Sequence, residues 1–259
     1  ITGAIAPSSV TGCSASNVPA PVTTVADLEL LGLAISDDCT PDANLVVSSN
    51  DVPSGTCPIV VTRKYTVKDA CNNAATYDQS ISVTSPAVVF TCGNDKTENA
   101  CQSQTAIQDS YDAWLLTTTA SGGCNGSLTN NAPPSAPLAC GGSVAVTWTY
   151  TSSCAPLTTT CTKTFTVTNA PSVNFTCATD HTEAACQTQG AISSAFTTWL
   201  GTITANGGCN GSLVTIPASP SAPSACGGAT TVTWNYTSTC GTMQTCTKTF
   251  TVTNSSAPT

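Results

Sequence analysis

The reactive side chains of this sequence are its cysteines. The chain of 259 residues holds 16 of them, an even number, beside a single histidine, His181. So many thiols are a liability in a reducing cytosol, whereas outside it they form a disulfide framework. There is no CxxC motif, and one histidine cannot complete a zinc site of Cys and His ligands at metal-binding spacing. We therefore expect disulfides and an oxidising, extracellular compartment.

The cysteines recur with a period of about 85 residues, which is typical of an array of repeats. The segment "ACGGSVAVTWTYTSSC" at 139–154 returns as "ACGGATTVTWNYTSTC" at 225–240. The equivalent cysteines are Cys92/Cys177, Cys101/Cys186, Cys124/Cys209, Cys140/Cys226, Cys154/Cys240 and Cys161/Cys246. Two near copies therefore occupy most of the chain.

The first third of the chain is a divergent copy. Its segment "DLELLGLAISDDC" (27–39) aligns with "DAWLLTTTASGGC" (112–124), and the spacing of Cys57 and Cys71 equals that of Cys140 and Cys154. The sequence predicts three domains: 1–85 with four cysteines, and 86–170 and 171–259 with six each.

The links between these repeats are short and contain proline, which favours extended, semi-rigid spacers. They read "TSPAVV" (84–89) and "TNAPSV" (168–173). The tail "TVTNSSAPT" (251–259) matches "TVTNAPSVN", so we expect it to begin a further linker of a longer array.

Strand geometry restricts the disulfide pairing. If 140–154 is one strand, its ends lie roughly 45 Å apart, far beyond the ~5.5 Å between bonded Cα atoms, so Cys140 cannot bond Cys154. The first repeat lacks equivalents of both Cys92 and Cys161, which predicts that these two are bonded to each other. Pairing the remaining adjacent ends within each repeat is one of 15 connectivities for six cysteines. The predicted bonds are Cys13–Cys57, Cys39–Cys71, Cys92–Cys161, Cys101–Cys140, Cys124–Cys154, Cys177–Cys246, Cys186–Cys226 and Cys209–Cys240.

The elements that must position these cysteines are mostly strands. Val144, Val146, Trp148 and Tyr150 alternate with Ser, Ala and Thr, so one face is core and the other is solvent. The following "CTKTFTVT" completes a hairpin. Helical spacing of apolar residues precedes them at Ile107, Tyr111, Trp114 and Leu115, and again at Ile192, Phe196, Trp199 and Leu200. The predicted fold is all-β: tandem immunoglobulin-like β-sandwich repeats, each with one short helix and stapled by disulfides.

Two motif sets carry a resemblance to known repeats. "SGTCPIVVTRKYTVKDACNNAATYDQSISV" in the first copy resembles the HYR-like, immunoglobulin-like repeat of very large Bacteroidota surface proteins. Residues 90–168 and 175–253, with "GGC" and "CTKTFTVTN", resemble the companion repeat of those proteins, which include SprB-type gliding-motility adhesins exported by type IX secretion. The resemblance implies an extracellular stalk or filament on a bacterial cell surface and supplies no catalytic residues.

An acidic group in the first repeat is a candidate calcium site. Asp37, Asp38 and Asp42 flank Cys39, and Asp69 precedes Cys71. If Cys39 and Cys71 are bonded, these carboxylates converge at one pole, and carboxylate oxygens suit calcium. The alternative is a solvated acidic loop, since no EF-hand spacing is present.

Other candidate sites favour structural interpretations. His181 is the one residue that could serve a Ser/His/Asp triad, but its sister repeat has lysine there, which favours a surface turn. Arg63 occupies a core-facing position that Val146 fills in the second repeat. A buried guanidinium needs a partner, and we expect a carboxylate from another strand because Asp69 is about 20 Å away on its own strand. We expect no enzyme activity.

Composition limits the partners. A net charge of -8 with six Lys+Arg argues against nucleic acid. No run of ~18 apolar residues is present to span a membrane. The aromatics other than Tyr77 are repeat-matched, and repeated aromatics at core parity favour packing, so they offer no evident sugar-stacking surface. We predict a load-bearing segment of a surface adhesin that contacts neighbouring repeats. The alternatives are repeats that bind polysaccharide or abiotic surfaces, self-assembly through strand edges or termini, and accessory domains of a secreted enzyme.

Overall fold

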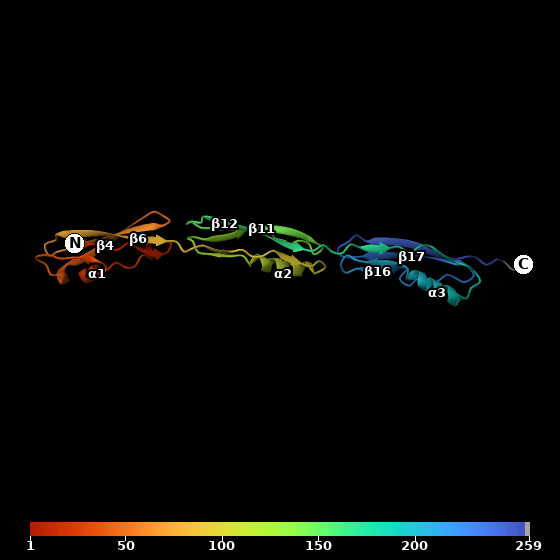
Figure 1. Ribbon diagram of the computed structural model, residues 1–259. Helices are drawn as coiled ribbons and strands as arrows, with labels where there is room; N and C mark the ends of the chain where they lie inside the picture. The colour runs from red at the N-terminus through yellow and green to blue at the C-terminus, as the bar shows by residue number, and fades with distance from the viewer. Residues whose placement is uncertain (257–259) are drawn as a thin grey trace. The chain divides into compact units, whose positions relative to one another are not determined.

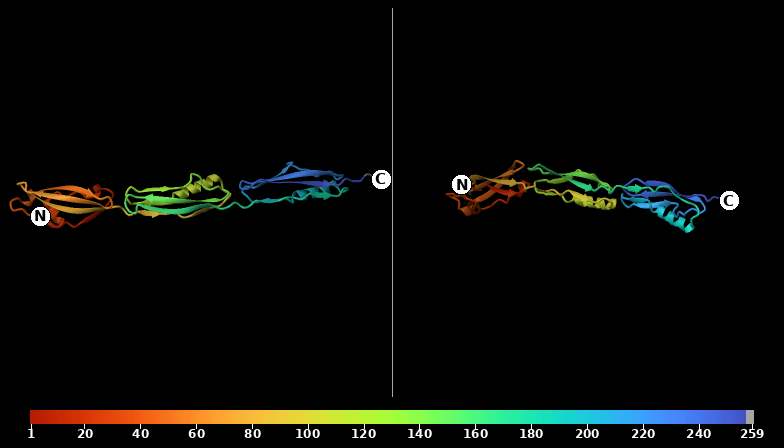
Figure 2. Two further views of the ribbon diagram at one scale, coloured as in Figure 1. Left: turned by 90° about the horizontal axis from the view of Figure 1, so that it is seen from above. Right: turned by 45° about the vertical axis from the view of Figure 1, so that its right-hand side comes forward.

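The computed structural model describes residues 1–256, so the last three residues of the expected further linker lie outside the described part. Three four-stranded sheets dominate it, and each is formed by strands of a single sequence repeat. Figures 1 and 2 show one helix of each repeat lying along one side of that repeat's sheet. None of the described helices has the length and apolar character needed to cross a bilayer.

The first repeat places a four-stranded sheet of order β2-β6-β5-β4 against α1 and a two-stranded sheet, β1-β3. The helix α1 begins at Val25, where the Thr24 side chain accepts a hydrogen bond from the Asp27 N–H and so caps the first turn. The elements are β1 (Thr2–Gly3), β2 (Ser8–Thr11), η1 (Ala15–Asn17), α1 (Val25–Leu30), β3 (Leu33–Ala34), η2 (Asp42–Asn44), β4 (Val46–Ser54), β5 (Ile59–Lys68) and β6 (Ala74–Thr84).

The second repeat has the same plan, with the sheet order β10-β11-β12-β8 and a two-stranded sheet, β7-β9. Its elements are β7 (Val89–Thr91), β8 (Lys96–Glu98), α2 (Gln104–Leu115), β9 (Thr119–Ser121), β10 (Ser127–Asn130), β11 (Gly142–Thr151) and β12 (Thr158–Val167). The helix buries Ile107, Tyr111 and Trp114, the spacing that the sequence predicted.

The third repeat repeats the plan again, as β16-β17-β18-β14 with β13-β15. Its elements are β13 (Asn174–Thr176), β14 (His181–Glu183), α3 (Gln189–Leu200), β15 (Thr204–Asn206), β16 (Ser212–Ile216), β17 (Gly228–Thr237) and β18 (Gln244–Val252). In all three repeats the first strand of the large sheet, β2, β8 or β14, pairs in parallel with the last one.

The core lies between the helix and the large sheet. In the third repeat, Phe196 and Trp199 of α3 pack with Trp234 of β17 and Phe250 of β18, and their rings meet edge to face. Such aromatic contacts contribute about 0.5–1.5 kcal/mol each beyond the burial of their area. In the first repeat, Leu28 of α1 packs in one cluster with Tyr65 of β5. The predicted fold class, tandem immunoglobulin-like sandwiches with one short helix each, is confirmed.

Compact units do not follow the sequence repeats. One unit comprises Ile1–Asn94, Leu116–Ala132 and Val146–Lys163, and the other comprises Asp95–Leu115, Pro133–Ala145 and the described residues from Thr164. The division runs through the second repeat, so the three domains 1–85, 86–170 and 171–259 stay a prediction.

Candidate functional site

Two disulfides lie inside repeats, as the sequence predicted. Cys92, directly after β7, is bonded to Cys161 of β12, and Cys177 is bonded to Cys246 of β18. Their Cα atoms are 6.2 and 5.7 Å apart. In each bond the first cysteine directly follows the first strand of the two-stranded sheet, β7 or β13, and the second lies on an inner strand of the four-stranded sheet, β12 or β18. The two layers of the sandwich are therefore joined covalently.

The remaining predicted pairing is wrong. The structure forms none of the bonds Cys13–Cys57, Cys39–Cys71, Cys101–Cys140, Cys124–Cys154, Cys186–Cys226 and Cys209–Cys240. The bonds that it forms instead join consecutive repeats: Cys13–Cys124, Cys57–Cys154, Cys101–Cys209 and Cys140–Cys240. Cys140 and Cys154 flank β11 at its two ends and are not bonded to each other, as predicted, but each reaches a cysteine of an adjoining repeat.

These bonds follow one rule. We call the cysteines that bond to the following repeat the forward pair, and those that bond to the preceding repeat the backward pair. The forward pairs and their equivalents are Cys13/Cys57, Cys101/Cys140 and Cys186/Cys226. The backward pairs and their equivalents are Cys39/Cys71, Cys124/Cys154 and Cys209/Cys240. The first forward cysteine always bonds to the first backward cysteine and the second to the second.

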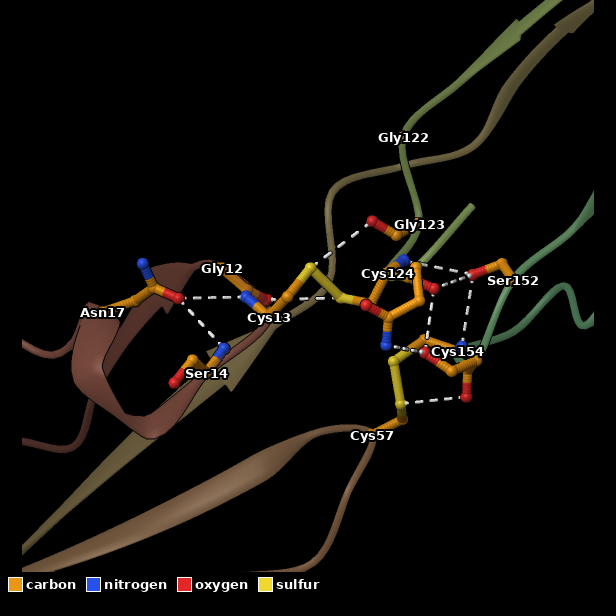
Figure 3. The surroundings of a disulfide bond; sticks show 12 residues. Gly12, Cys13, Ser14, Asn17, Cys57, Gly122, Gly123, Cys124, Ser152 and Cys154 are labelled. Atoms are coloured by element: carbon orange, nitrogen blue, oxygen red, sulfur yellow. Dashed lines mark hydrogen bonds between the residues drawn. A yellow bond between two sulfur atoms is a disulfide. The ribbon is translucent and has the colours of Figure 1, made fainter. Parts of the chain in front are cut away.

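Figure 3 shows the junction between the first and second repeats. The Cα atoms are 5.5 Å apart in both Cys13–Cys124 and Cys57–Cys154, within the usual range for a disulfide. The Cys13 Sγ also lies 3.4 Å from the carbonyl oxygen of Gly123, and the Cys57 Sγ lies 3.4 Å from that of Ser153. A disulfide sulfur has no proton, so these are packing contacts.

The same contacts recur at the junction between the second and third repeats. The Cys101 Sγ lies 3.7 Å from the Gly208 carbonyl oxygen, and the Cys140 Sγ lies 3.6 Å from that of Thr239. In every case the contacted carbonyl belongs to the residue before the bonded backward cysteine. The two junctions are therefore built alike.

The "GGC" motif at 122–124 sets the backbone conformation before the backward cysteine Cys124 and contacts the linker at 84–89. Gly122 and Gly123 have φ values of +81° and +62°, which glycine adopts without strain. The Gly123 N–H donates to the Pro86 carbonyl at 2.8 Å, and a Cβ on Gly122 would collide with the Ala87 carbonyl oxygen. The Tyr150 hydroxyl donates to the Gly122 carbonyl at 2.7 Å. Only glycine lets the linker pass so close to the backward cysteine.

Ser152 holds the two cysteines of the backward pair together. Its Oγ accepts hydrogen bonds from the backbone N–H groups of Cys124, at 3.1 Å, and Cys154, at 3.2 Å. The Ser153 N–H donates to the Cys124 carbonyl at 2.8 Å. These hydrogen bonds fix the Cys124 loop to the Cys154 loop and so hold the two sulfur atoms in place.

A glutamine at the start of the helix holds the forward pair. The Gln104 Oε1 accepts from the Ala139 N–H at 2.9 Å, and its Nε2 donates to the Pro137 carbonyl at 3.1 Å. The Cys101 N–H in turn donates to the Ala139 carbonyl at 3.1 Å. The loop that carries Cys140 is thus fixed to the helix and to Cys101 at once.

The proposed calcium site loses its premise, because Cys39 and Cys71 are both free and exposed. Asp37 and Asp69 line one pocket together, but across residues 1–256 no three His, Cys, Asp or Glu side chains gather as a metal-binding group. A calcium site formed by Asp37, Asp38, Asp42 and Asp69 therefore stays a prediction. The Asp37 Oδ1 accepts from the N–H groups of Cys39 and Thr40, and these two hydrogen bonds lower the pKa of Asp37. Asp37 acts as a turn cap.

Arg63 has the carboxylate partner from another strand that the sequence led us to expect. Its side chain is 3% exposed, and its Nε and Nη2 donate to Asp51 of β4 at 2.7 and 2.8 Å. Its Nη2 also donates to the Pro19 carbonyl at 2.7 Å. The guanidinium hydrogen bond lowers the pKa of Asp51. Asp51 lies directly opposite Arg63 in the β4–β5 ladder, which is why the two meet.

His181 lies in a strand, β14, and not in the surface turn that we expected. Its Nε2 is 2.8 Å from Glu183 Oε1, and its ring stacks on Phe250 at 4.9 Å. His181 and Glu183 line a shallow pocket of ≈ 280 Å³ together with Trp199. The Glu183 carboxylate also accepts from Gln187, and these hydrogen bonds lower the pKa of Glu183. The contacts of His181 are thus the hydrogen bond with Glu183 and the stacking on the buried ring of Phe250.

No protein-family model matches the chain, and no curated protein matches it. Solved structures that it resembles include the protocadherin GammaB4 extracellular domain, with a TM-score of 0.33, 10% identity, and coverage of 82% of this chain and 45% of that one. The chain thus spans less than half of the protocadherin.

Two further cadherin structures show a similar likeness. Drosophila N-cadherin EC1-4 has a TM-score of 0.31 and 11% identity, with 98% of this chain and 75% of that one covered. The human desmocollin-1 ectodomain has a TM-score of 0.32 and 9% identity, with coverage of 98% and 61%.

Proposed function

We propose that this chain is a load-bearing stalk segment of a large secreted adhesin, and that it has no catalytic role. The observation that carries the proposal is the pair of disulfides at each of the two junctions between repeats. One bond is enough to hold two repeats together. Two bonds at separate points also resist their twisting and bending, which suits a part that transmits force.

The disulfides shorten the path along which force travels. The shortest covalent route runs through 1–13, crosses to 124–140, and crosses again to 240–256. That route is about 47 residues, or roughly 160 Å when fully extended, against roughly 870 Å for the described chain without bonds. Most of each repeat is therefore shielded from tension applied at the ends.

The compartment and the surface chemistry support the same function. Six disulfides require an oxidising environment, so we place the protein outside the cytoplasm. Only 8% of the residues are charged, and Ser and Thr supply most of the polar surface. The HYR-like motifs support a finer proposal: a gliding-motility type adhesin on a bacterial surface, exported by type IX secretion.

Single-molecule stretching tests the proposal. The oxidised chain, held at its two ends, is expected to stop extending at roughly 160 Å, and reductant should release most of the remaining length. Removing one junction bond with Cys140→Ser/Cys240→Ser lengthens the shortest route to 1–13, 124–177 and 246–256, about 78 residues. The limit should then rise by roughly 100 Å.

A matched variant controls for general destabilisation. Cys92→Ser/Cys161→Ser also removes a disulfide, but it lies off the force-bearing route, so the extension limit should stay where it is. An oxidised chain that unfolds domain by domain to several hundred ångströms would refute the load-bearing role.

A further inference from the structure

Four cysteines are free among the described residues, and all four are exposed: Cys39, Cys71, Cys186 and Cys226. They are not scattered. Cys186 and Cys226 are the forward pair of the third repeat, and Cys39 and Cys71 are the backward pair of the first. Every other forward or backward pair in the structure is bonded to a neighbouring repeat.

The free forward pair has the backbone geometry of a bonded one. Cys186 has a φ of +68° and its bonded equivalent Cys101 has +69°, in the left-handed region that side chains other than glycine rarely adopt. The Gln189 Oε1 accepts from the Ala225 N–H at 2.9 Å, and its Nε2 donates to the Pro223 carbonyl at 3.1 Å. Gln104 makes the same two bonds at the same distances beside Cys140.

The loop before the first forward cysteine is pinned equally in both repeats. The Ala185 N–H donates to Thr253 Oγ1 at 3.0 Å, and the Ala100 N–H donates to Thr168 Oγ1 at 2.9 Å. A bond to a partner is therefore not what creates this geometry. The third repeat presents Cys186 and Cys226 ready for a partner.

The free backward pair is also held in place. Cys39 donates its N–H to Asp37 Oδ1 at 3.0 Å, and the next residue, Thr40, is buried. The Thr40 Oγ1 accepts from the Ala70 N–H at 3.3 Å, which ties the Cys39 loop to the Cys71 loop. Thr40 thus does in the first repeat what Ser152 and Ser153 do in the second.

We propose that a free forward pair joins the free backward pair of another repeat through two disulfides, which between two copies of this chain are Cys186–Cys39 and Cys226–Cys71. The pairing follows the rule of both internal junctions, first with first and second with second. A further repeat of the same design is therefore the partner, and a second copy of this chain supplies one because it exposes both kinds of pair at once. Such a head-to-tail contact uses two different surfaces, so it builds an open-ended chain of molecules. The inference extends the proposed stalk function and rests on its view of the junctions.

The reaction needs an oxidant, and a small-molecule disulfide such as oxidised glutathione can supply it. For each new Sγ–Sγ bond, two S–H bonds break, and two electrons and two protons pass to one glutathione disulfide, which leaves as two thiols. The route is attack of a cysteine thiolate on the glutathione disulfide, then attack of the partner thiolate on the mixed disulfide. Each junction consumes two glutathione disulfides.

Two variants test the joining. Cys39→Ser/Cys71→Ser keeps only the forward pair free, and Cys186→Ser/Cys226→Ser keeps only the backward pair. All four positions are exposed and unbonded, so neither variant removes an existing disulfide. With oxidised glutathione, the unchanged chain should give a ladder of covalent multimers on a non-reducing gel. Each variant alone should stay monomeric, and their mixture should give a dimer and nothing longer.

Peptide mass spectrometry then reads the bonds in the mixed dimer. Cys186–Cys39 and Cys226–Cys71 peptides are expected. The proposal is overturned if the chain stays monomeric with Cys186–Cys226 and Cys39–Cys71 bonds, if one variant dimerises with itself, or if the peptides show the crossed pairing. None of these results changes the extension limit expected in the stretching experiment, because that limit depends only on the disulfides between the repeats of one chain.

Discussion

Cys101 donates its backbone N–H to the Ala139 carbonyl, one residue from Cys140, yet its sulfur is bonded to Cys209, 108 positions further along the chain. Neighbouring loops therefore do not decide the pairing here. Cys101 and Cys140, the forward pair of the second repeat, both bond to the third repeat, at Cys209 and Cys240. The repeats are covalently coupled to one another, and the second and third are also stapled internally. The coupling between repeats is the basis of the proposed function.

Removing Asp51 should destabilise the first repeat strongly. In Asp51→Ala, the Arg63 guanidinium stays buried without a carboxylate partner, and an uncompensated buried charge costs about 3–5 kcal/mol. Because Asp51 is 34% exposed and water can enter, we predict about 2–3 kcal/mol, measured by urea unfolding.

Two comparisons make that result specific. Asp78→Ala breaks an exposed ion pair with Lys64 at 4.0 Å and should cost under about 1 kcal/mol. The double variant Arg63→Met/Asp51→Ala should recover most of the loss, because an apolar side chain needs no partner there. Equal costs for Asp51→Ala and Asp78→Ala would contradict a buried pair.

Acid should weaken the same ion pair. The pKa of Asp51 is lowered below its ordinary value of 3.8 by the hydrogen bond from Arg63. A carboxyl with a lowered pKa in the folded state adds stability above its ordinary pKa and loses it as the pH falls through the folded value. We therefore expect the stability gap between the unchanged chain and Asp51→Asn to be constant near neutral pH. It should close only below about pH 4, and a gap that closes at higher pH would contradict this assignment.

The sequence predicted the fold well because its signals were local. Alternation around Trp148 placed the core face of β11, and the Ile107, Tyr111 and Trp114 spacing placed α2, since both patterns depend on neighbouring residues. The Arg63 partner was predicted only as a carboxylate from another strand. Its identity as Asp51 required the β4–β5 register.

The disulfide pairing could not be predicted in the same way, because it depends on how one repeat meets the next. Internal comparison found Cys92–Cys161 since both cysteines are missing from the first repeat together. For the rest, proximity within a repeat was assumed. One signal was available in the sequence: the first repeat keeps only the four cysteines of the forward and backward pairs and lacks the two that join the layers of the sandwich, so those four serve something else.

The "GGC" motif should be intolerant of side chains. In Gly122→Ala, the added Cβ collides with the Ala87 carbonyl, and the alanine has to adopt a φ of +81°. We predict a loss of about 1–3 kcal/mol in urea unfolding. Gly190→Ala in α3 is the matched control, because the nearest heavy atom to its Cβ would be 4.0 Å away. It should be neutral or stabilising by up to about 1 kcal/mol. A tolerated Gly122→Ala would show that the linker does not press against this loop.

Cutting the chain between repeats distinguishes the two kinds of pairing directly. The linker at 84–89 is the only peptide connection between the first two repeats, so a protease site inserted after Thr84 separates them unless disulfides hold them. With Cys13–Cys124 and Cys57–Cys154 in place, the cut chain should migrate as one species without reductant and as two with it. Either bond alone is sufficient, so Cys57→Ser/Cys154→Ser should behave like the unchanged chain. Only the fourfold variant that also carries Cys13→Ser and Cys124→Ser should separate without reductant. If the unchanged chain separated on cutting alone, the disulfides would lie within repeats and the force-bearing route would not exist.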